Sequence, residues 1–140
     1  MNVGDVFGPS SWIEIPQERI NAFADATDDH QWIHVDPERA KDGPFGGTIG
    51  HGYLTLSLLP SASYEVVPRQ GGRMSINYGL NKVRFPSPVP VGSRVRCTAS
   101  VASIEEPAPG TVQITLSNSI EIEGGSKPAC IAESVVRYVL

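Results

Sequence analysis

The sequence predicts an α+β fold in which one antiparallel sheet of about five strands surrounds a single apolar helix. Three observations lead to this prediction. The C-terminal half alternates apolar and polar side chains, as half-buried strands do. A segment that begins at Gly52 is apolar on all sides, which is typical of a helix inside a protein. The 140 residues contain no internal repeat and suffice for one core, so we expect a single domain over residues 1–140.

A short helix is expected near the N-terminus. Pro16 opens a segment in which Ile20, Phe23 and Ala24 recur at helical spacing. The polar residues 25–30 then interrupt the apolar pattern, so we expect the helix to end there.

The apolar helix is expected over residues 52–66, where Glu65 is the single charged residue. A helix of this composition has to be covered by the sheet. Pro60 lies inside the segment and removes one backbone donor, so we expect it to bend or shorten the helix.

Four strands are expected after this helix, over residues 73–85, 93–104, 112–122 and 130–138. Gly and Pro in the segments 105–110 and 123–128 allow the chain to reverse, so residues 93–140 should form an antiparallel meander. In the last strand one face carries Cys130, Ala132, Ser134, Val136 and Tyr138. Residues 86–92 are too rich in proline for a central strand and are expected to be a connection.

Charge and composition exclude several classes of partner. The 11 Lys and Arg against 15 Asp and Glu give a net charge of -4, so the basic field that attracts nucleic acid or an anionic membrane is missing. The longest apolar stretch, residues 53–59, is far shorter than the roughly 20 residues of a membrane span, and no secretion leader is recognisable.

We expect Cys97 and Cys130 to be buried thiols in a reducing cytoplasm. No metal-ligand spacing and no nucleotide or flavin motif is evident, so no cofactor is expected.

Side chains suited to acid–base chemistry gather in two short segments. Residues 28–34 (DDHQWIH) hold two carboxylates and two imidazoles, and His51 and Gly52 lead into the apolar helix. A carboxylate and an imidazole that converge in a cleft can hold a water between them and move its proton near neutral pH. The spacing of Asp29 and His34 permits such a pair. It equally fits a helix-capping carboxylate and a packed histidine, so spacing alone leaves both interpretations open.

The string FADATDDHQWIHVDPERAKDGPFGGTIGHGYLTLSLLP resembles the MaoC-like, or (R)-specific enoyl-CoA hydratase, family of hot-dog-fold proteins. The family signature falls on Phe23, Asp29, Gln31, Trp32, Ile33, His34, His51 and Gly52. Gln31 stands where the family usually has Asn, and Trp32 where Pro is common. This variant is similar to the branch that contains the NodN relatives and the mycobacterial 3-hydroxyacyl-thioester dehydratases. The resemblance extends from about Gly4 to Leu140 and implies a sheet wrapped around a long central helix.

The resemblance also implies a role for each matched residue. Asp29 accepts a proton from a bound water that adds to C3 of a trans-2-enoyl thioester, while His34 positions that water and takes part in protonating C2. The backbone N–H of Gly52 stabilises the negative charge on the thioester oxygen, which a glycine allows to come close. Gln31 orients the pair through its amide. His51 either caps the helix or lines the site and is left without a role.

The function predicted from this resemblance is an (R)-specific enoyl-CoA hydratase, which in reverse is a 3-hydroxyacyl-CoA dehydratase. Two alternatives stay open: an acyl-CoA thioesterase on the same fold, and a NodN-like acyl-thioester binding protein with little turnover. The carrier is coenzyme A or acyl carrier protein, and the acyl chain length is open. Lys82, Arg84 and Arg94 are candidates for contacts with coenzyme A phosphates, although basic residues on strands more often form only a solvated face. We expect a homodimer, because one sheet cannot fully cover the apolar helix and because the family joins two sheets edge to edge.

Overall fold

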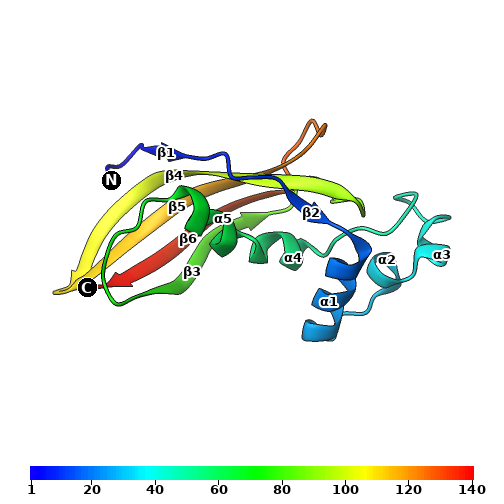
Figure 1. The fold of residues 1–140 in the computed structure, drawn as a ribbon, viewed down its shortest axis with the longest axis horizontal. Coiled ribbons are helices and arrows are strands. Elements are labelled where there is room, and N and C mark those ends of the chain that lie inside the picture. Colours follow the sequence, from blue (N-terminus) through cyan, green and yellow to red (C-terminus); the bar gives the residue numbers. More distant parts are fainter.

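Six antiparallel strands form one curved sheet, with helices along its concave side and beyond one of its ends (Figure 1). The structure, a computed structural model, describes residues 1–140. In chain order the elements are β1 (Val6–Phe7), β2 (Ile13–Ile15), α1 (Gln17–Thr27), α2 (Trp32–Val35), α3 (Pro37–Ala40), α4 (Gly52–Ser57), α5 (Leu59–Val66), β3 (Met74–Arg84), β4 (Ser93–Ala108), β5 (Thr111–Ile122) and β6 (Cys130–Val139). The strand order is β1-β4-β5-β6-β3, and β2 also pairs with β4.

The meander predicted over residues 93–140 is confirmed, since β4, β5 and β6 pair in sequence order. β4 is longer than expected and continues to Ala108. A register shift between Glu105 and Ala108 accommodates Pro107, which has no N–H for the ladder. The reversal is therefore a tight turn in which Gly110 adopts a φ of +78°.

The sheet has six strands where about five were predicted, and the two that the sequence did not locate lie at the N-terminus. β1 and β2 contain two and three residues and pair with different parts of β4. Segments this short show no alternation with a period of two. They are strands because their backbones pair with the edge of β4.

The single long helix expected over residues 52–66 is wrong, because the structure has two short helices, α4 and α5, that meet at Leu58. Pro60 occupies the second position of α5. Proline lacks the N–H that would bond to the carbonyl of Leu56, and its ring clashes with that carbonyl. The N–H of Leu58 donates to the carbonyl of Thr55 at 3.2 Å and closes the last turn of α4. The break thus lies where the bend at Pro60 was predicted.

None of the helices combines the length and the apolar composition that crossing a bilayer needs.

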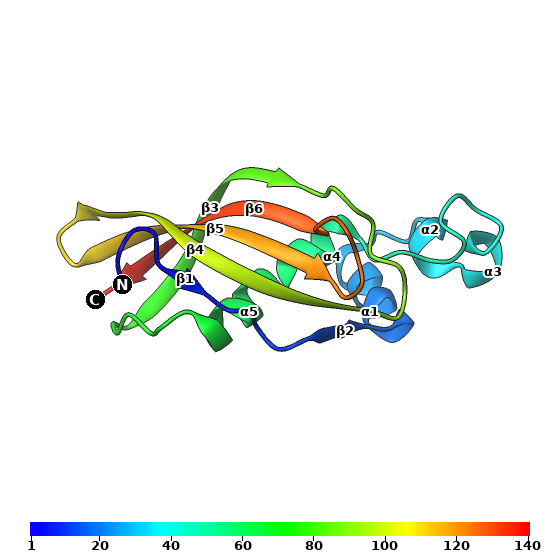
Figure 2. The same ribbon diagram turned by 90° about the horizontal axis from the view of Figure 1, so that it is seen from above.

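The main core lies between the sheet and the helices α1, α4 and α5 (Figures 1 and 2). Its 12 buried residues are Ile15, Ile20, Leu54, Leu59, Ala62, Val89, Val95, Cys97, Ile120, Ala129, Cys130 and Ala132. Cys97 and Cys130 are free thiols in this core, as predicted. Burial raises the pKa of each thiol to about 11.

The helices leave part of the concave face uncovered. A cavity of about 890 Å³ opens there between α4 and α5, the segment that follows α5, and the strands β3, β5 and β6. Ser134, Val136 and Tyr138 line it and are only half-buried, although they share the predicted face of β6 with buried Cys130 and Ala132. The predicted apolar face is therefore closed at one end of β6 and open at the other.

Candidate active site

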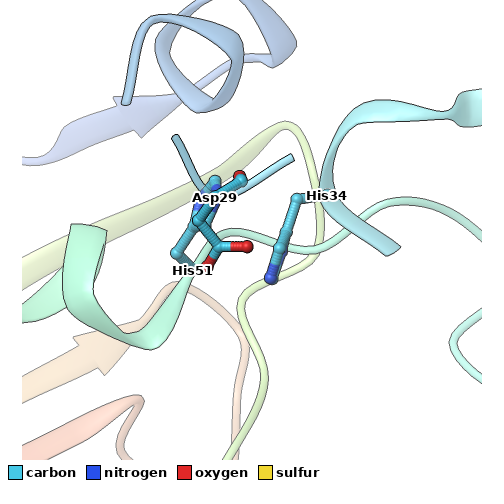
Figure 3. Close-up of side chains that lie close together, drawn as sticks. All are labelled: Asp29, His34 and His51. Carbon is cyan, nitrogen blue, oxygen red and sulfur yellow. The ribbon is translucent and has the colours of Figure 1, made fainter. Parts of the chain in front are cut away.

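Asp29, His34 and His51 lie together at the end of the molecule away from the two chain termini (Figures 1 and 3). Asp29 belongs to the loop after α1, His34 to α2, and His51 directly precedes α4. One carboxylate oxygen or ring nitrogen from each residue lies within 4.8 Å of the corresponding atoms of the other two. Because one hydrogen bond spans about 2.7–3.0 Å, a single water can touch both Asp29 and His34. The structure thus brings together the two residues that the sequence analysis paired, and adds His51.

The chain reaches Asp29 through a sharp turn at the end of α1. The hydroxyl of Thr27 donates to the carbonyl of Phe23 at 2.8 Å and closes the last turn of the helix. Asp28 follows in the left-handed conformation, with a φ of 61°. Asp tolerates this conformation better than most residues that carry a side chain. The left-handed residue ends α1 and turns the chain towards the site.

His34 is buried, and a hydrogen bond from its Nδ1 to the carbonyl oxygen of Ile49, at 2.7 Å, sets the orientation of its ring. A carbonyl only accepts, so Nδ1 carries the hydrogen and Nε2 of the neutral ring is an acceptor. Burial lowers the pKa of His34; the bond to Ile49 opposes this shift, His51 reinforces it, and Asp29 opposes it. The ring is therefore neutral near pH 7, with Nε2 able to accept from a water.

The backbone around His34 is anchored by Gln17 of α1. The side-chain amide of Gln17 donates to the carbonyl of His34 at 2.8 Å and accepts from the hydroxyl of Thr48 at 2.6 Å. These bonds join α1, α2 and the loop that leads to α4. Sequence reasoning missed Gln17, because a polar residue in the first turn of a helix carries no distinctive signal.

The carboxylate of Asp29 is exposed to solvent, and one of its oxygens accepts a long hydrogen bond of 3.4 Å from the backbone N–H of Gln31. The side-chain amide of Gln31, for which an orienting role was predicted, forms no hydrogen bond within the chain. The hydrogen bond between residue 31 and Asp29 is thus made by the backbone of residue 31. Trp32, which stands where the family often has Pro, packs under the guanidinium of Arg39 at 4.3 Å and against Gly43.

His51 is 2% exposed and contacts both members of the pair. Its Nε2 lies 3.0 Å from the backbone oxygen of Asp29, to which it donates. Its ring stacks on that of His34, with the ring centroids 3.9 Å apart and the planes inclined by 22°. The adjacent His51 and Gly52 indicated in the sequence that His51 could line the site. The sequence did not indicate which groups His51 would contact.

His30, the other histidine of the segment 28–34, lies outside this cluster. Its Nε2 bonds the carboxylate of Asp25 at 2.9 Å, and both side chains are exposed. The hydrogen bond to Asp25 raises the pKa of His30. His30 is therefore a surface residue that serves as a control for the buried histidines.

Gly52 begins α4, and its backbone N–H forms no hydrogen bond within the chain. The ring of Phe85 packs on its Cα, so that a Cβ at this position would lie 3.1 Å from two ring carbons. The N–H of Gly52 is therefore a backbone donor without a partner in the chain, and the lack of a side chain makes room for the Phe85 ring.

Two imidazoles and a carboxylate are also a set of side chains that binds transition metals. The geometry does not suit one ion, however. A metal lies close to the plane of each imidazole that binds it, because the nitrogen lone pair lies in the ring plane. The nearly parallel rings of His34 and His51, 3.9 Å apart, cannot both point their lone pairs at one ion. The arrangement fits a water held by hydrogen bonds.

Comparison with known proteins gives matches along most of the chain. Residues 1–121 match the family described as MaoC like domain. The 3-hydroxyacyl-thioester dehydratase Z of Mycobacterium tuberculosis (strain ATCC 25618 / H37Rv) is 60% identical over 136 residues, which cover 97% of this chain and 90% of that protein. Nodulation protein N of Rhizobium leguminosarum bv. viciae is 46% identical over 132 residues, which cover 93% of this chain and 82% of that protein.

A solved structure, the (R)-hydratase of Aeromonas caviae involved in PHA biosynthesis, matches the fold with a TM-score of 0.80. It is 29% identical, and the match covers 97% of this chain and 96% of that one. The predicted hot-dog fold is thereby confirmed, apart from its broken central helix. The match of residues 1–121, the 60% identity to a dehydratase and this likeness of fold lead to one conclusion: the chain belongs to the MaoC-like domain family.

Proposed function

We propose that this chain is a hydro-lyase that reversibly adds water to a trans-2-enoyl thioester and forms the (R)-3-hydroxyacyl thioester. The observation that carries the proposal is the convergence of the Asp29 carboxylate and a neutral His34, next to the free N–H of Gly52. A carboxylate and a neutral imidazole can hold and deprotonate a water. The dehydratase and hydratase among the relatives support the same reaction, since dehydration is the reverse of hydration.

In the proposed mechanism the water donates one hydrogen to Asp29 and the other to Nε2 of His34, which leaves a lone pair directed at C3. Asp29 takes the proton as the water oxygen bonds to C3. Nδ1 of His34 is engaged with Ile49, and Nε2 carries no hydrogen at the start. The C3 hydroxyl keeps the other hydrogen of the water, so the proton that C2 receives is the one on Asp29, which passes it to Nε2 of His34, and His34 hands it to C2. The proton that leaves the water thus ends on C2, and both side chains return to their initial states.

As the C2–C3 double bond is broken, negative charge gathers on the thioester oxygen and an enolate forms. We assign the stabilisation of this oxygen to the N–H of Gly52, which no other group of the chain occupies. Since α4 has only six residues, we ascribe the effect to this single donor and not to a helix dipole. Mutagenesis of comparable donors gives losses of about 10²–10³-fold in rate.

For the acyl chain we propose the cavity on the uncovered concave face. Its lining begins at Leu56 and Ser57, about one helical turn after Gly52, and continues over apolar side chains of α5, β3 and β6. Its volume of about 890 Å³ lies in the upper part of the usual range for ligand pockets, roughly 300–1,000 Å³. We therefore expect enoyl thioesters with chains longer than crotonyl to be substrates.

For the carrier we propose coenzyme A, bound through Lys82 and Arg84. Both lie at the end of β3 that leads into Phe85, whose ring contacts Gly52, and neither forms an ion pair. Arg94, the third basic candidate, instead bonds Glu123 at 3.1 Å, so we assign it no phosphate. Lys82→Ala and Arg84→Ala should raise KM for crotonyl-CoA but not for crotonyl-pantetheine, which lacks the nucleotide. An equal effect on both thioesters would contradict this assignment.

We propose that β3 pairs with β3 of a second copy. One edge of this strand has no partner, and it exposes Met74, Ile76, Tyr78 and Leu80 to extents between 43% and 57%. An apolar edge strand that stays uncovered promotes aggregation, and a two-fold partner would cover it. Light scattering at micromolar concentration should give a dimer, which Ile76→Lys disrupts while the exposed Val3→Lys does not. A monomeric wild type would contradict the pairing.

We also place the protein in the cytoplasm. The support is the pair of buried free thiols, Cys97 and Cys130, which is usual in reducing compartments.

Incubation with crotonyl-CoA and with longer trans-2-enoyl-CoAs tests the proposed reaction. Hydration should remove the absorbance of the conjugated enoyl thioester without releasing free thiol, and chiral chromatography should identify the (R) product. Release of free thiol would instead indicate the thioesterase. Binding of these thioesters without any loss of absorbance would indicate the acyl-thioester binding protein.

A further inference from the structure

His51 is a buried titratable residue to which the proposed reaction assigns no step. The oxygen 3.0 Å from its Nε2 is the backbone carbonyl of Asp29, which only accepts, so Nε2 carries the hydrogen. Nδ1 of the neutral ring is then a bare acceptor, and it is buried without a hydrogen-bond partner. Most buried polar atoms in proteins have partners, because an unpaired one destabilises the fold. The unpaired Nδ1 of His51 is therefore expected to destabilise the fold.

The ring of His51 has one face on His34 and a second neighbour in Phe23. The imidazoles of His51 and His34 lie side by side (Figure 3) and are stacked, with their centroids 3.9 Å apart. The ring of Phe23 lies 4.9 Å from that of His51, at an angle of 56°. His51 is thereby immobilised in the core, at the start of α4. Its N–H contacts Asp29 in the loop after α1, and its ring contacts His34 in α2.

We propose that His51 is a positioning residue that holds Asp29 by its backbone carbonyl and His34 by its ring, so that the carboxylate and Nε2 of His34 meet at one water. The expected effect of His51 on the rate rests on the proposed function. The expected effect of His51 on the titration of His34 does not depend on that function.

The stacked arrangement also favours the neutral form of His34. The groups that face the His34 ring are the carboxylate of Asp29, the carbonyl of Ile49 and the ring of His51. The first two favour a protonated ring, whereas the ring of His51 opposes it, because two protonated imidazoles stacked 3.9 Å apart would repel each other. His51 thus acts against the protonation that would block Nε2 as an acceptor.

Three variants separate the two contacts. His51→Phe keeps a flat ring against His34 but removes the N–H that holds Asp29. His51→Gln keeps an amide N–H near the position of Nε2 but removes the ring. His30→Phe makes the same chemical change at an exposed histidine beside Asp29 and is the matched control.

We expect His51→Phe to lower kcat for crotonyl-CoA hydration by about 10²-fold with little change in KM, as a misplacement of about 1 Å does at other sites. His51→Gln should recover part of this loss because it restores the donor. The acid limb of the pH profile of kcat/KM should move to higher pH in His51→Phe. His30→Phe should leave all three quantities unchanged.

Nitrogen-15 NMR of the imidazoles gives a readout that does not depend on turnover. In the wild type we expect His34 to carry its hydrogen on Nδ1, and in His51→Phe to titrate at higher pH. An unchanged His34 titration in His51→Phe overturns the inference whatever the rate. A wild-type kcat in folded His51→Phe also overturns the inference. The same holds if His51→Phe and His51→Gln lose kcat to the same extent and melting temperature to the same extent, because that result indicates a purely structural role. If the wild type hydrates no enoyl thioester while the His34 titration still moves, the proposed function fails and the positioning of His34 by His51 stands.

Discussion

Replacing Asp29 with Asn separates the chemistry of the site from its structure. The exposed carboxylate accepts one long hydrogen bond of 3.4 Å, from the N–H of Gln31, and an amide oxygen can accept the same bond. The structural contact of residue 29 runs through its backbone carbonyl to His51 and is unaffected by the substitution. We therefore expect the free energy of unfolding to change by no more than about 0.5 kcal/mol.

The rate should respond very differently. The amide of Asn does not accept a proton near pH 7, so the water loses its base. General acid–base catalysis contributes roughly 10²–10⁴-fold, which corresponds to about 2.7–5.4 kcal/mol of activation free energy. The cavity and the N–H of Gly52 still bind the thioester, so KM should change little. The expected loss of transition-state stabilisation is thus at least five times the expected change in stability.

The assay follows the loss of enoyl-thioester absorbance with crotonyl-CoA, alongside a urea titration of each variant. His34→Ala should cause a loss comparable to that of Asp29→Asn, and the double variant should be little worse than either, because residues that act on one water are not additive. His30→Ala is the control and should retain the wild-type rate. A wild-type rate in folded Asp29→Asn would refute the assignment of Asp29 as the base.

Three further outcomes are expected. Acidification should destabilise the protein through His34. The pKa of His34 in the folded protein lies below the ordinary value of 6.5, so the unfolded chain binds the proton first. The free energy of unfolding should therefore fall as the pH drops below about 6.5. Urea titrations against pH should show this slope in the wild type and a weaker one in His34→Gln. Cys97 and Cys130, with pKa values of about 11, should stay unmodified by an aromatic disulfide reagent in the native state and react in denaturant, so rapid native modification would contradict their burial. Gly52→Ala keeps the N–H but adds a Cβ 3.1 Å from the Phe85 ring, so activity should fall and stay low even when Phe85→Ala makes room. Recovery in that double variant would show that Gly52 serves packing and not substrate approach.

The sheet and the paired residues of the site were predictable because their signals are local. Alternation with a period of two identifies a strand and its buried face within a single segment, and this was enough for β4, β5 and β6. Their order followed from turns that are themselves short and rich in Gly and Pro. Asp29 and His34 lie five residues apart, so a short signature contains both, and Pro60 shows where a helix cannot continue.

Tertiary structure decided what depends on segments far apart in the sequence. β1 and β2 are too short to have a pattern and exist because β4 offers an edge. Pro60 predicts an interruption of the helix, but only the fold shows that the chain divides at Leu58 and that Leu54 and Leu59, on either side of the break, both lie in the core. His51 bonds Asp29 across 22 residues, and the carbonyl of Ile49 sets the tautomer of His34 across 15. A hydrogen bond between such distant residues leaves neither a period nor a spacing in the chain, so only folding reveals which atoms meet.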